Sequence, residues 1–337
     1  MSKNKLNNDY FKSKPAPILI TVYDRLDKLK DCINSLLKNE LSKHTIVYIS
    51  SDNYSKKSDQ IKVNSVRDYI NSIKGFKKVV KVFHKKNLGG SLAAELARKI
   101  LFENHNKFIF LEDDIEVSPS FLNYMNKGLD FYKNNPNIFS ICGFSPSIMS
   151  DFYDINAPNK IYFNHSWAAW GVASWKDKFL EFNEFRNSDG LLNTVNKDLK
   201  DNKLVKSLNI LSPKYYIHLL YCIKNKKVPE FDFLAAYYCL KNSMYNVYSN
   251  HTLTKNYGHD GTGLRSLKDE LINSKMDRAR YPEVLPDFKP INELDILNSL
   301  PLKSENNFQA LLKIVLIKIG LFDFFKSIHR KFYKKIV

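Results

Sequence analysis

Cysteine is scarce in this sequence of 337 residues. The four cysteines lie far apart and form no C-x-x-C pair, so the sequence predicts neither a zinc site nor a disulfide framework. We expect the thiols to be reduced and buried, as in a protein of a cytosolic compartment. The residues are Cys32, Cys142, Cys222 and Cys239.

Long apolar runs are also absent. No stretch is long enough to cross a bilayer as a helix, which argues against a transmembrane protein. Residues 1–14 are polar and contain no apolar segment. We therefore expect a flexible lead-in, with neither a signal peptide nor an N-terminal anchor.

The glycine-rich motifs of two nucleotide-binding folds are missing. No G-x-G-x-x-G follows the first predicted strand, and no G-x-x-x-x-G-K-[ST] occurs in the chain. These absences argue against a Rossmann dinucleotide site and against a P-loop. The pair Gly89-Gly90 stands alone, and it fits either a turn before a helix or a phosphate contact.

Positive charge, by contrast, is abundant. The formal net charge is +17, and much of it comes from lysine in a chain that is also rich in Asn and Ile. Such an excess fits anionic partners, namely nucleotides, acidic lipid surfaces or nucleic acid. With 44% hydrophobic residues, the chain also has enough apolar side chains for a substantial core.

Apolar runs and helical periodicities alternate from residue 15 onward. Their spacing predicts strands at 18–22, 46–49, 79–83, 108–111 and 138–142. Between them it predicts helices at 26–39, 63–73, 92–103 and 121–132. This alternation is typical of an α/β fold with a mostly parallel central sheet, flanked by helices and joined by right-handed crossovers.

A polar cluster follows each of the first four predicted strands. The clusters are Asp24-Arg25, Asp52-Asn53, Lys85-Lys86-Asn87 and Glu112-Asp113-Asp114. Parallel strands end at one edge of a sheet, and ligands bind at that edge. We therefore expect the four clusters to meet in one binding site. Lys85 is a candidate diphosphate contact there, although solvated lysines are common.

The acidic motif, Glu112-Asp113-Asp114, is the strongest single signal. Adjacent carboxylates repel one another, and a divalent cation would remove the repulsion. Mg²⁺ or Mn²⁺ is held by one or two carboxylates plus substrate phosphates, so the motif indicates a metal–diphosphate site. The alternative is an acid-rich helix start in solvent, because Ser118 and Pro119 read as the N-cap and the first residue of the next helix.

The second half of the chain carries weaker signals. Residues 143–164 look irregular, 176–228 are polar with a helical pattern, and 246–249 read as a short strand. A helix is predicted at 233–241, with Asp232 near its start. Asp232 therefore reads either as a catalytic base or as an acid that stabilises the helix N-terminus.

All three tryptophans fall within residues 165–175, and a glycine-rich loop is predicted at 256–263. Tryptophan rings stack on sugar rings or fill a protein core. We expect Trp175 in the core and either Trp167 or Trp170 facing an acceptor.

The segment 308–337 mixes apolar and basic residues. Its pattern is too interrupted to span a membrane but fits an interfacial helix on anionic lipid. The alternatives are a helix docked on the enzyme's own surface and a dimer contact. We favour the membrane surface.

In order along the chain, these motifs resemble the nucleotide-sugar-dependent glycosyltransferases of the GT-A fold. The resemblance is closest to the group that includes animal N-acetylglucosaminyltransferase I and many bacterial surface-polysaccharide transferases. It covers residues 15–265. The matching pieces are 18–25, 48–53, 111–119, 167–175, 231–232 and 256–263.

The resemblance implies roles for individual residues. Asp114 would be the direct metal ligand, with Asp113 beside the ribose and metal and Glu112 beside the donor sugar. Arg25 and Asp52 would hold the nucleotide, with Asp52 near the base. The catalytic base would be Asp232, and His259 would be a further metal or diphosphate contact.

These observations together predict a metal-dependent inverting glycosyltransferase that uses Mn²⁺ or Mg²⁺. It would move a sugar from a nucleoside-diphosphate donor, UDP by the resemblance, to a hydroxyl of a glycan or lipid-linked glycan in cell-surface polysaccharide synthesis. We expect it in the cytoplasm, peripheral on the inner face of the cell membrane. The predicted parts are a lead-in at 1–14, a GT-A domain at 15–265 with halves 15–120 and 121–265, a connector at 266–307 and the tail at 308–337.

Two other classes of protein share some of these features. A nucleotide-sugar-forming nucleotidyltransferase would have a similar sheet, but it should carry a glycine-rich loop where Tyr23-Asp24-Arg25 stands. A basic nucleic-acid-binding protein would explain the charge, but it should show basic and aromatic residues on a recognised module. The sequence shows neither feature, so nucleic acid is not an expected partner.

Overall fold

The computed structural model describes residues 14–145, 160–258, 260, 288–289, 307–325 and 327. The chain forms two compact units, which are described separately below. Unit 1 comprises residues 1–163, 168–179 and 246–295, and unit 2 comprises 164–167, 180–245 and 296–337. The domain limits inferred from the sequence stay predictions.

Unit 1 is built on a mixed, mostly parallel sheet with the strand order β3-β2-β1-β4-β8-β6-β9-β7. Strands β1 to β4 run parallel to one another, and β8 pairs antiparallel with both β4 and β6. The bounds are β1 Ile18–Val22, β2 Ile46–Ser51, β3 Lys78–Phe83, β4 Lys107–Glu112, β6 Ile138–Cys142, β7 Ile161–Asn164, β8 Val172–Trp175 and β9 Tyr245–Ser249. The predicted α/β class with a mostly parallel sheet is confirmed.

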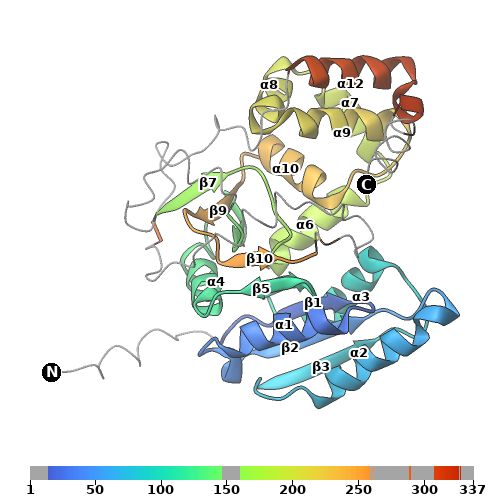
Figure 1. The fold of residues 1–337 in the computed structure, drawn as a ribbon. Coiled ribbons are helices and arrows are strands. Elements are labelled where there is room, and N and C mark those ends of the chain that lie inside the picture. The colour runs from blue at the N-terminus through green and yellow to red at the C-terminus, as the bar shows by residue number, and fades with distance from the viewer. Residues whose placement is uncertain are drawn as a thin grey trace. The chain divides into compact units, whose positions relative to one another are not determined.

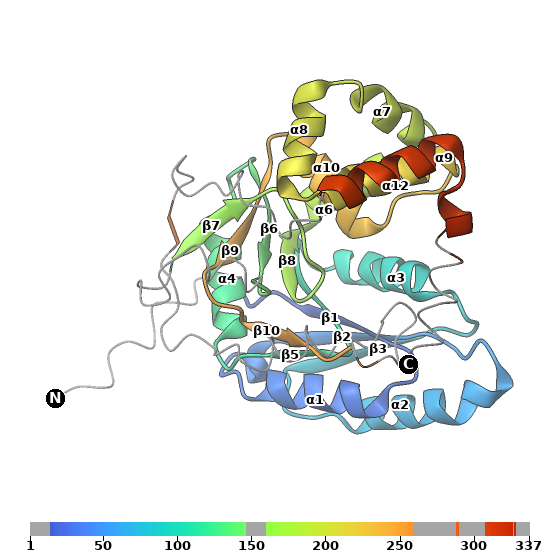
Figure 2. The ribbon, with the colours of Figure 1, turned by 45° about the horizontal axis from the view of Figure 1, so that its top comes forward.

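Helices cover both faces of the parallel half of this sheet. Helices α1 (Leu26–Leu37) and α2 (Gln60–Ser72) lie on one face, and α3 (Gly90–Phe102) lies on the other (Figure 2). Helix α1 buries Leu29, Ile33 and Leu36, which are spaced as one face of a helix requires. The predicted apolar periodicity therefore does point into the core.

The register brings the ends of the parallel strands level with one another. Val22 lies opposite Ser51, Ser51 lies opposite Phe83, and Thr21 lies opposite Glu112. The polar clusters that follow these four strands thus start at the same edge of the sheet, as predicted from the sequence.

The acidic motif leads into a second, two-stranded sheet and not directly into a helix. Strand β5 (Ile115–Val117) pairs antiparallel with β10 (Thr254–Asn256), as Figure 1 shows. The predicted helix start at Ser118 and Pro119 is wrong, because the Ser118 N–H donates to the Leu253 carbonyl at 2.9 Å and prolongs this pairing. Helix α4 begins at Phe121 and ends at Phe131.

Two further local predictions need correction. Helix α3 begins at Gly90 with Gly89 as its N-cap, two residues before the predicted start at residue 92. Strands β7 and β8 were missed because they are buried at every position and carry no alternation of polar and apolar residues. The tryptophan-rich stretch thus ends in a central strand, and Trp175 is buried as expected.

Unit 2 is helical. The polar region 176–228 is divided into α6 (Lys176–Arg186), α7 (Leu191–Asp198), α8 (Asn202–Leu211) and α9 (Pro213–Lys224). Helices α8 and α9 are separated at Ser212, whose side chain caps α9, and Pro213 occupies the first turn of α9. Helix α10 (Phe231–Lys241) carries Asp232 in its first turn, as predicted.

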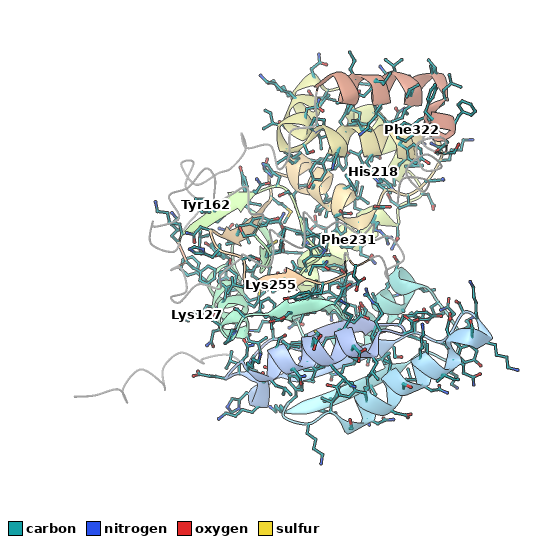
Figure 3. The ribbon with its side chains drawn as sticks, in the orientation of Figure 1. Lys127, Tyr162, His218, Phe231, Lys255 and Phe322 are labelled. Carbon is teal, nitrogen blue, oxygen red and sulfur yellow. The ribbon has the colours of Figure 1, made fainter. Side chains whose placement is uncertain are left out.

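The C-terminal tail contributes helix α12 (Asn307–Ile319), which packs on α9. Ala310 and Ile317 are buried against Ile217, and Phe322 lies beside Tyr221 (Figure 3). The Tyr221 hydroxyl donates to Asp323 at 2.9 Å. One face of the tail helix is therefore docked on the enzyme's own surface, which was the alternative to membrane binding.

The expected burial of the cysteines is met by the described residues. All four cysteines are buried, and none of these described residues forms a disulfide. In the part of the chain that the structure describes, none of the helices has the length and apolar character needed to traverse a bilayer.

Candidate functional site

The acidic motif forms a turn between β4 and β5, and Arg25 binds it. Glu112 ends β4, and Asp113 and Asp114 form the turn. The Arg25 guanidinium contacts both carboxylates: Nε donates to Asp113 Oδ2 at 3.3 Å, Nη2 pairs with Asp113 Oδ1, and Nη2 lies 2.8 Å from Asp114 Oδ2. Arg25 comes from the end of β1, one strand away, because β1 and β4 are neighbours in register.

The electrostatics of this turn are those of two buried acids with one cation between them. Both Asp113 and Asp114 are buried, whereas Arg25 is partly exposed. Burial raises the pKa of Asp113 to about 7, against the opposing effect of Arg25. Burial lowers the pKa of Arg25, but the two acids outweigh it and raise that pKa above its ordinary value. The single guanidinium of Arg25 does not balance two carboxylates, so a further cation would be favourable at this turn.

Asp114 is the clearest candidate for a metal ligand. Its Oδ1 atom is buried and, among the described residues, has no hydrogen-bond partner. A buried carboxylate oxygen without a partner is costly, and a divalent cation would satisfy it. The donor set, carboxylate oxygens alone, suits Mg²⁺ or Mn²⁺. In the described ranges, no three or more His, Cys, Asp or Glu side chains are grouped so that they could hold a metal ion by themselves, so such a cation would draw its remaining ligands from water and substrate phosphate.

The segment after β10 passes directly over this turn. The Tyr257 N–H donates to the Asp114 carbonyl at 2.9 Å. Gly258 is buried, and a Cβ added to it would lie 2.2 Å from Asp114 Oδ2. Only glycine fits here without displacing the carboxylate. Lys28 holds the segment from α1: its ammonium donates to the Tyr257 carbonyl at 2.9 Å and lies 2.9 Å from Asp260 Oδ2.

Asp52 lies at the same edge, but its carboxylate is hydrogen-bonded to groups of the protein itself. It accepts hydrogen bonds from the backbone N–H groups of Asn53, Leu88 and Gly89 and from the Asn87 side chain, at 2.8–3.2 Å. Asp52 thus ties the end of β2 to the loop before α3. Its predicted place beside a nucleotide base stays a prediction.

Two other predicted donor contacts lie at this edge without a defined role. Lys85 is exposed, and its carbonyl accepts from the Asn53 side chain at 2.7 Å. Glu112 is half-buried, and its carbonyl lies 3.9 Å from the Cys32 sulfur. His259, predicted as a metal or diphosphate contact, lies outside the described residues.

In unit 2, Asp232 has an aromatic setting. Its neighbour Phe233 stacks on His218 of α9 at 4.0 Å between ring centroids and meets Tyr215 edge-on at 5.3 Å. His218 Nε2 accepts the N–H of Glu230, the N-cap of α10, at 3.2 Å. Burial, and then the charge of Asp232, raise the pKa of Tyr215 above its ordinary value. The start of α10 is therefore held by α9.

The two tryptophans predicted to meet an acceptor belong to different units. Trp167 is buried and packs on Phe231, the residue before Asp232, at 4.7 Å between centroids. Trp170 is half-buried in unit 1, where it meets Phe144 at 4.5 Å and its carbonyl accepts from Thr254 at 2.8 Å. Figure 3 marks Phe231 and His218 in unit 2. The assignment of either tryptophan to an acceptor stays a prediction.

Comparison with family models decides the identity of the chain. The model of the GNT-I family matches residues 2–182, which is more than half of the sequence and includes the whole acidic turn and Arg25. The chain belongs to the GNT-I family. The GNT-I family is an N-acetylglucosaminyltransferase family, so this member is a nucleotide-sugar glycosyltransferase of the GT-A type. Membership decides against the nucleotidyltransferase and nucleic-acid-binding classes.

Two solved structures resemble this GNT-I family member at low identity. The first is the mannosyltransferase PcManGT from Pyrobaculum calidifontis, in complex with GDP-Man and Mn²⁺, at 12% identity and a TM-score of 0.38 over 69% of this chain and 74% of that one. The second is S. aureus TarS, at 12% identity and a TM-score of 0.31 over 68% of this chain and 54% of that one. A search of curated proteins finds no match.

Several residues at the acidic turn and at the start of the Asp232 helix carried no usable signal in the sequence. Lys28 lies one helical turn after Arg25, but a lysine in a lysine-rich chain does not stand out. Gly258 belongs to a predicted glycine-rich loop, yet its contact with Asp114 depends on the pairing of β5 with β10, and β10 was not predicted. His218 became a neighbour of the Asp232 helix only through the packing of α9 on α10.

Proposed function

We propose that this GNT-I family member is a metal-dependent inverting glycosyltransferase. It moves a sugar, a hexose or N-acetylhexosamine, from a nucleoside-diphosphate donor, UDP-linked by the family resemblance, to a hydroxyl of a glycan or lipid-linked glycan. The pathway we propose is the synthesis of a bacterial cell-surface polysaccharide. The observation that carries the proposal is the buried Asp113–Asp114 turn, with one carboxylate oxygen of Asp114 left without a partner among the described residues.

In this proposal the acidic turn holds the donor's leaving group. Asp114 would hold the cation, and Mn²⁺ or Mg²⁺ would offset the negative charge that develops on the departing nucleoside diphosphate. Arg25 fixes the direction of both carboxylates through its contacts to Asp113 and Asp114. Asp52 orders residues 87–89 before α3 by accepting hydrogen bonds from the Asn87 side chain and from the Leu88 and Gly89 N–H groups.

Asp232 is the proposed general base. A sugar hydroxyl is a weak nucleophile at neutral pH, so its proton must leave as the new bond forms. The Asp232 carboxylate takes that proton, the hydroxyl oxygen attacks the anomeric carbon, and the bond to the diphosphate oxygen breaks. A single displacement of this kind inverts the anomeric centre. Trp167, Phe231 and Phe233 supply the ring surface around the base that suits a sugar acceptor.

We also propose that the enzyme works in the cytoplasm on the inner face of the cell membrane, which it binds through the C-terminal tail. Helix α12 is apolar on two sides. The side that packs on α9 includes Ala310 and Ile317. The other side is exposed and continues past the end of the helix. Its large apolar residues are Leu311, Leu312, Val315, Ile319, Leu321, Phe324 and Phe325. We call this set the outer tail face.

The partner that fits the outer tail face is an anionic lipid surface. Lys318 is exposed beside the face, and the sequence continues with Lys326, Arg330, Lys331, Lys334 and Lys335. An apolar face flanked by cations inserts into the headgroup region and attracts acidic lipids. A second copy of the chain would bring the same cations together, which disfavours that partner. A lipid-linked acceptor would lie at the same surface.

A screen of nucleotide sugars tests the enzymatic proposal. We expect one UDP-sugar to raise the melting temperature in Mn²⁺ but not in EDTA, and the same donor to support transfer. NMR of the product should show the anomeric configuration opposite to that of the donor. Retention of configuration would exclude the single displacement, and full activity in EDTA would exclude metal dependence.

A further inference from the structure

Helix α1 begins with two cations that contact the acidic turn region in different ways. Arg25, the N-cap of α1, binds the carboxylates of Asp113 and Asp114. Lys28, in the first turn of α1, binds Tyr257 and Asp260 and no carboxylate of the turn among the interactions of the described residues. We call the described residues Tyr257, Gly258 and Asp260 the strap. The two cations are thus one helical turn apart, but they act on different chain segments.

The strap is fixed to the acidic turn on one side and to Lys28 on the other. The Tyr257 N–H donates to the Asp114 carbonyl at 2.9 Å, and the Tyr257 carbonyl accepts from the Lys28 ammonium at 2.9 Å. Lys28 also pairs with Asp260 at 2.9 Å. Gly258 lies between these two attachments, and its N–H donates to the Asn256 side chain at 2.6 Å.

This arrangement presses Gly258 against the carboxylate that would hold the metal. A Cβ on Gly258 would stand 2.2 Å from Asp114 Oδ2 and 2.9 Å from its Cγ, so the backbone of the strap forms one wall of the site. The direction of the Asp114 carboxylate is then limited by Arg25 on one side and by the strap on another. Groups that orient a metal ligand commonly change metal affinity by about 10–100-fold when they are removed.

We propose that Lys28 is a positioning residue that latches the strap over Asp114 and so sets the affinity of the site for a divalent cation. The inference rests on the proposed function, because it takes Asp114 as the metal ligand. It adds a residue that touches neither the metal nor the nucleotide. Lys28 acts through the Tyr257 carbonyl and the Asp260 carboxylate, both of which it holds at hydrogen-bond distance.

The sign of the effect separates this role from a simple charge effect. Lys28 is a cation near a cation site, so by Coulomb's law its removal should strengthen Mn²⁺ binding. If Lys28 instead holds the strap in place, its removal should weaken Mn²⁺ binding, because the loosened strap leaves the Asp114 carboxylate free to turn away. If Lys28 were a direct ligand of the diphosphate, its removal would leave the affinity for Mn²⁺ alone equal or higher and would weaken only nucleotide binding.

The experiment measures Mn²⁺ binding to the purified full chain by EPR, without nucleotide. We expect Lys28→Met to weaken Mn²⁺ binding roughly tenfold, and Asp260→Asn to weaken it as well, although the two substitutions change the charge in opposite directions. Lys28→Arg keeps a cation of similar reach and should restore most of the affinity. The matched control is Lys62→Met, which removes an exposed lysine paired with Asp24 at 3.9 Å and leaves the strap alone.

Gly258→Ala is a second test that does not depend on Lys28. The added methyl group would meet Asp114 Oδ2, so we expect a larger loss of Mn²⁺ binding than for Lys28→Met, with the circular dichroism spectrum retained. Unchanged or tighter Mn²⁺ binding by Lys28→Met, or an equal change in Lys62→Met, would overturn the latch while leaving the proposed function standing. Absence of Mn²⁺ binding by the unaltered protein both without nucleotide and with a nucleoside diphosphate present would overturn the metal dependence and the latch together.

Discussion

The surroundings of the Asp113–Asp114 turn in unit 1 differ in kind from those of Asp232 in unit 2. The acidic turn is bound by a guanidinium and covered by the backbone of the strap, which an ammonium holds in place. Asp232 stands in the first turn of a helix whose start is held by aromatic rings and a histidine. Charged surroundings suit the binding of a cation and a diphosphate, whereas rings suit a sugar and a proton acceptor.

The comparison therefore predicts a division of labour that substitutions can test. Changes at the acidic turn should affect donor and metal binding, and changes around Asp232 should affect turnover with the donor still bound. The following predictions are ordered by the size of the effect expected.

Asp114→Ala should give the largest effect. Removal of the proposed metal ligand should abolish transfer and the Mn²⁺-dependent binding of nucleotide, measured by calorimetry, with the fold intact by circular dichroism. Asp27→Ala, an exposed acid on α1, is the control and should behave as the unaltered protein. Metal-dependent nucleotide binding by Asp114→Ala would place the metal elsewhere.

Asp232→Asn should lower kcat on the order of 10²–10⁴-fold, the range for loss of a general base. Asparagine keeps the shape and hydrogen-bonding capacity but cannot take the acceptor's proton. The donor affinity should stay nearly unchanged, which steady-state kinetics and calorimetry would show together. A fully active Asp232→Asn enzyme would show that Asp232 is not the general base, and the neighbouring Glu230 would then be the candidate.

His218→Leu should have an intermediate effect, roughly tenfold on kcat, with the donor affinity unchanged, because a misplacement of a catalytic group is costly. The substitution removes the acceptor of the Glu230 N–H and the ring that stacks on Phe233. His218→Gln keeps an acceptor and should recover part of the rate. In an Asp232→Asn background, His218→Leu should add little, since two groups that act as a unit are not additive. Additive losses would show that His218 acts independently of Asp232.

The smallest effect on catalysis is expected from the outer tail face. Replacement of Leu311, Val315 and Ile319 with Ser should release the protein from vesicles that contain acidic lipid, measured by co-sedimentation, while transfer to a soluble acceptor stays within about twofold, as expected for surface changes. Ile61→Ser, which alters an isoleucine that is 79% exposed on α2, is the matched control. Point substitutions are preferable to deletion of 308–337, because deletion would uncover Ile217 of α9. A dimer that the triple variant dissociates would identify a second copy as the partner instead.

The sequence allowed good predictions where local pattern and parallel topology determine the result. The strands 18–22, 46–49 and 79–83 and the helix starting at Leu26 lie close to their predicted limits. The meeting of Arg25 with the acidic motif at one sheet edge followed from the rule that parallel strands end together.

The remaining features depend on pairing between segments that are distant in sequence. Strand β10 is three residues long and is defined only by its partner β5, so neither the strap nor the role of Gly258 could be anticipated. The same pairing displaced the predicted helix start from Ser118. The docking of α12 on α9 was left open because both sides of that helix are apolar, and periodicity does not tell which side is covered.

The contact between Lys28 and the strap also bears on how the protein is made. Lys28 and Tyr257 are 229 positions apart in the chain. At a synthesis rate of about 5–20 residues per second, the strap emerges ~10–45 s after the helix that holds it. During that interval Arg25 alone neutralises the acidic turn. Ribosome-bound chains that end before β10 should therefore hold a formed sheet edge but a poor metal site, and acquisition of the cation becomes one of the last steps of biogenesis.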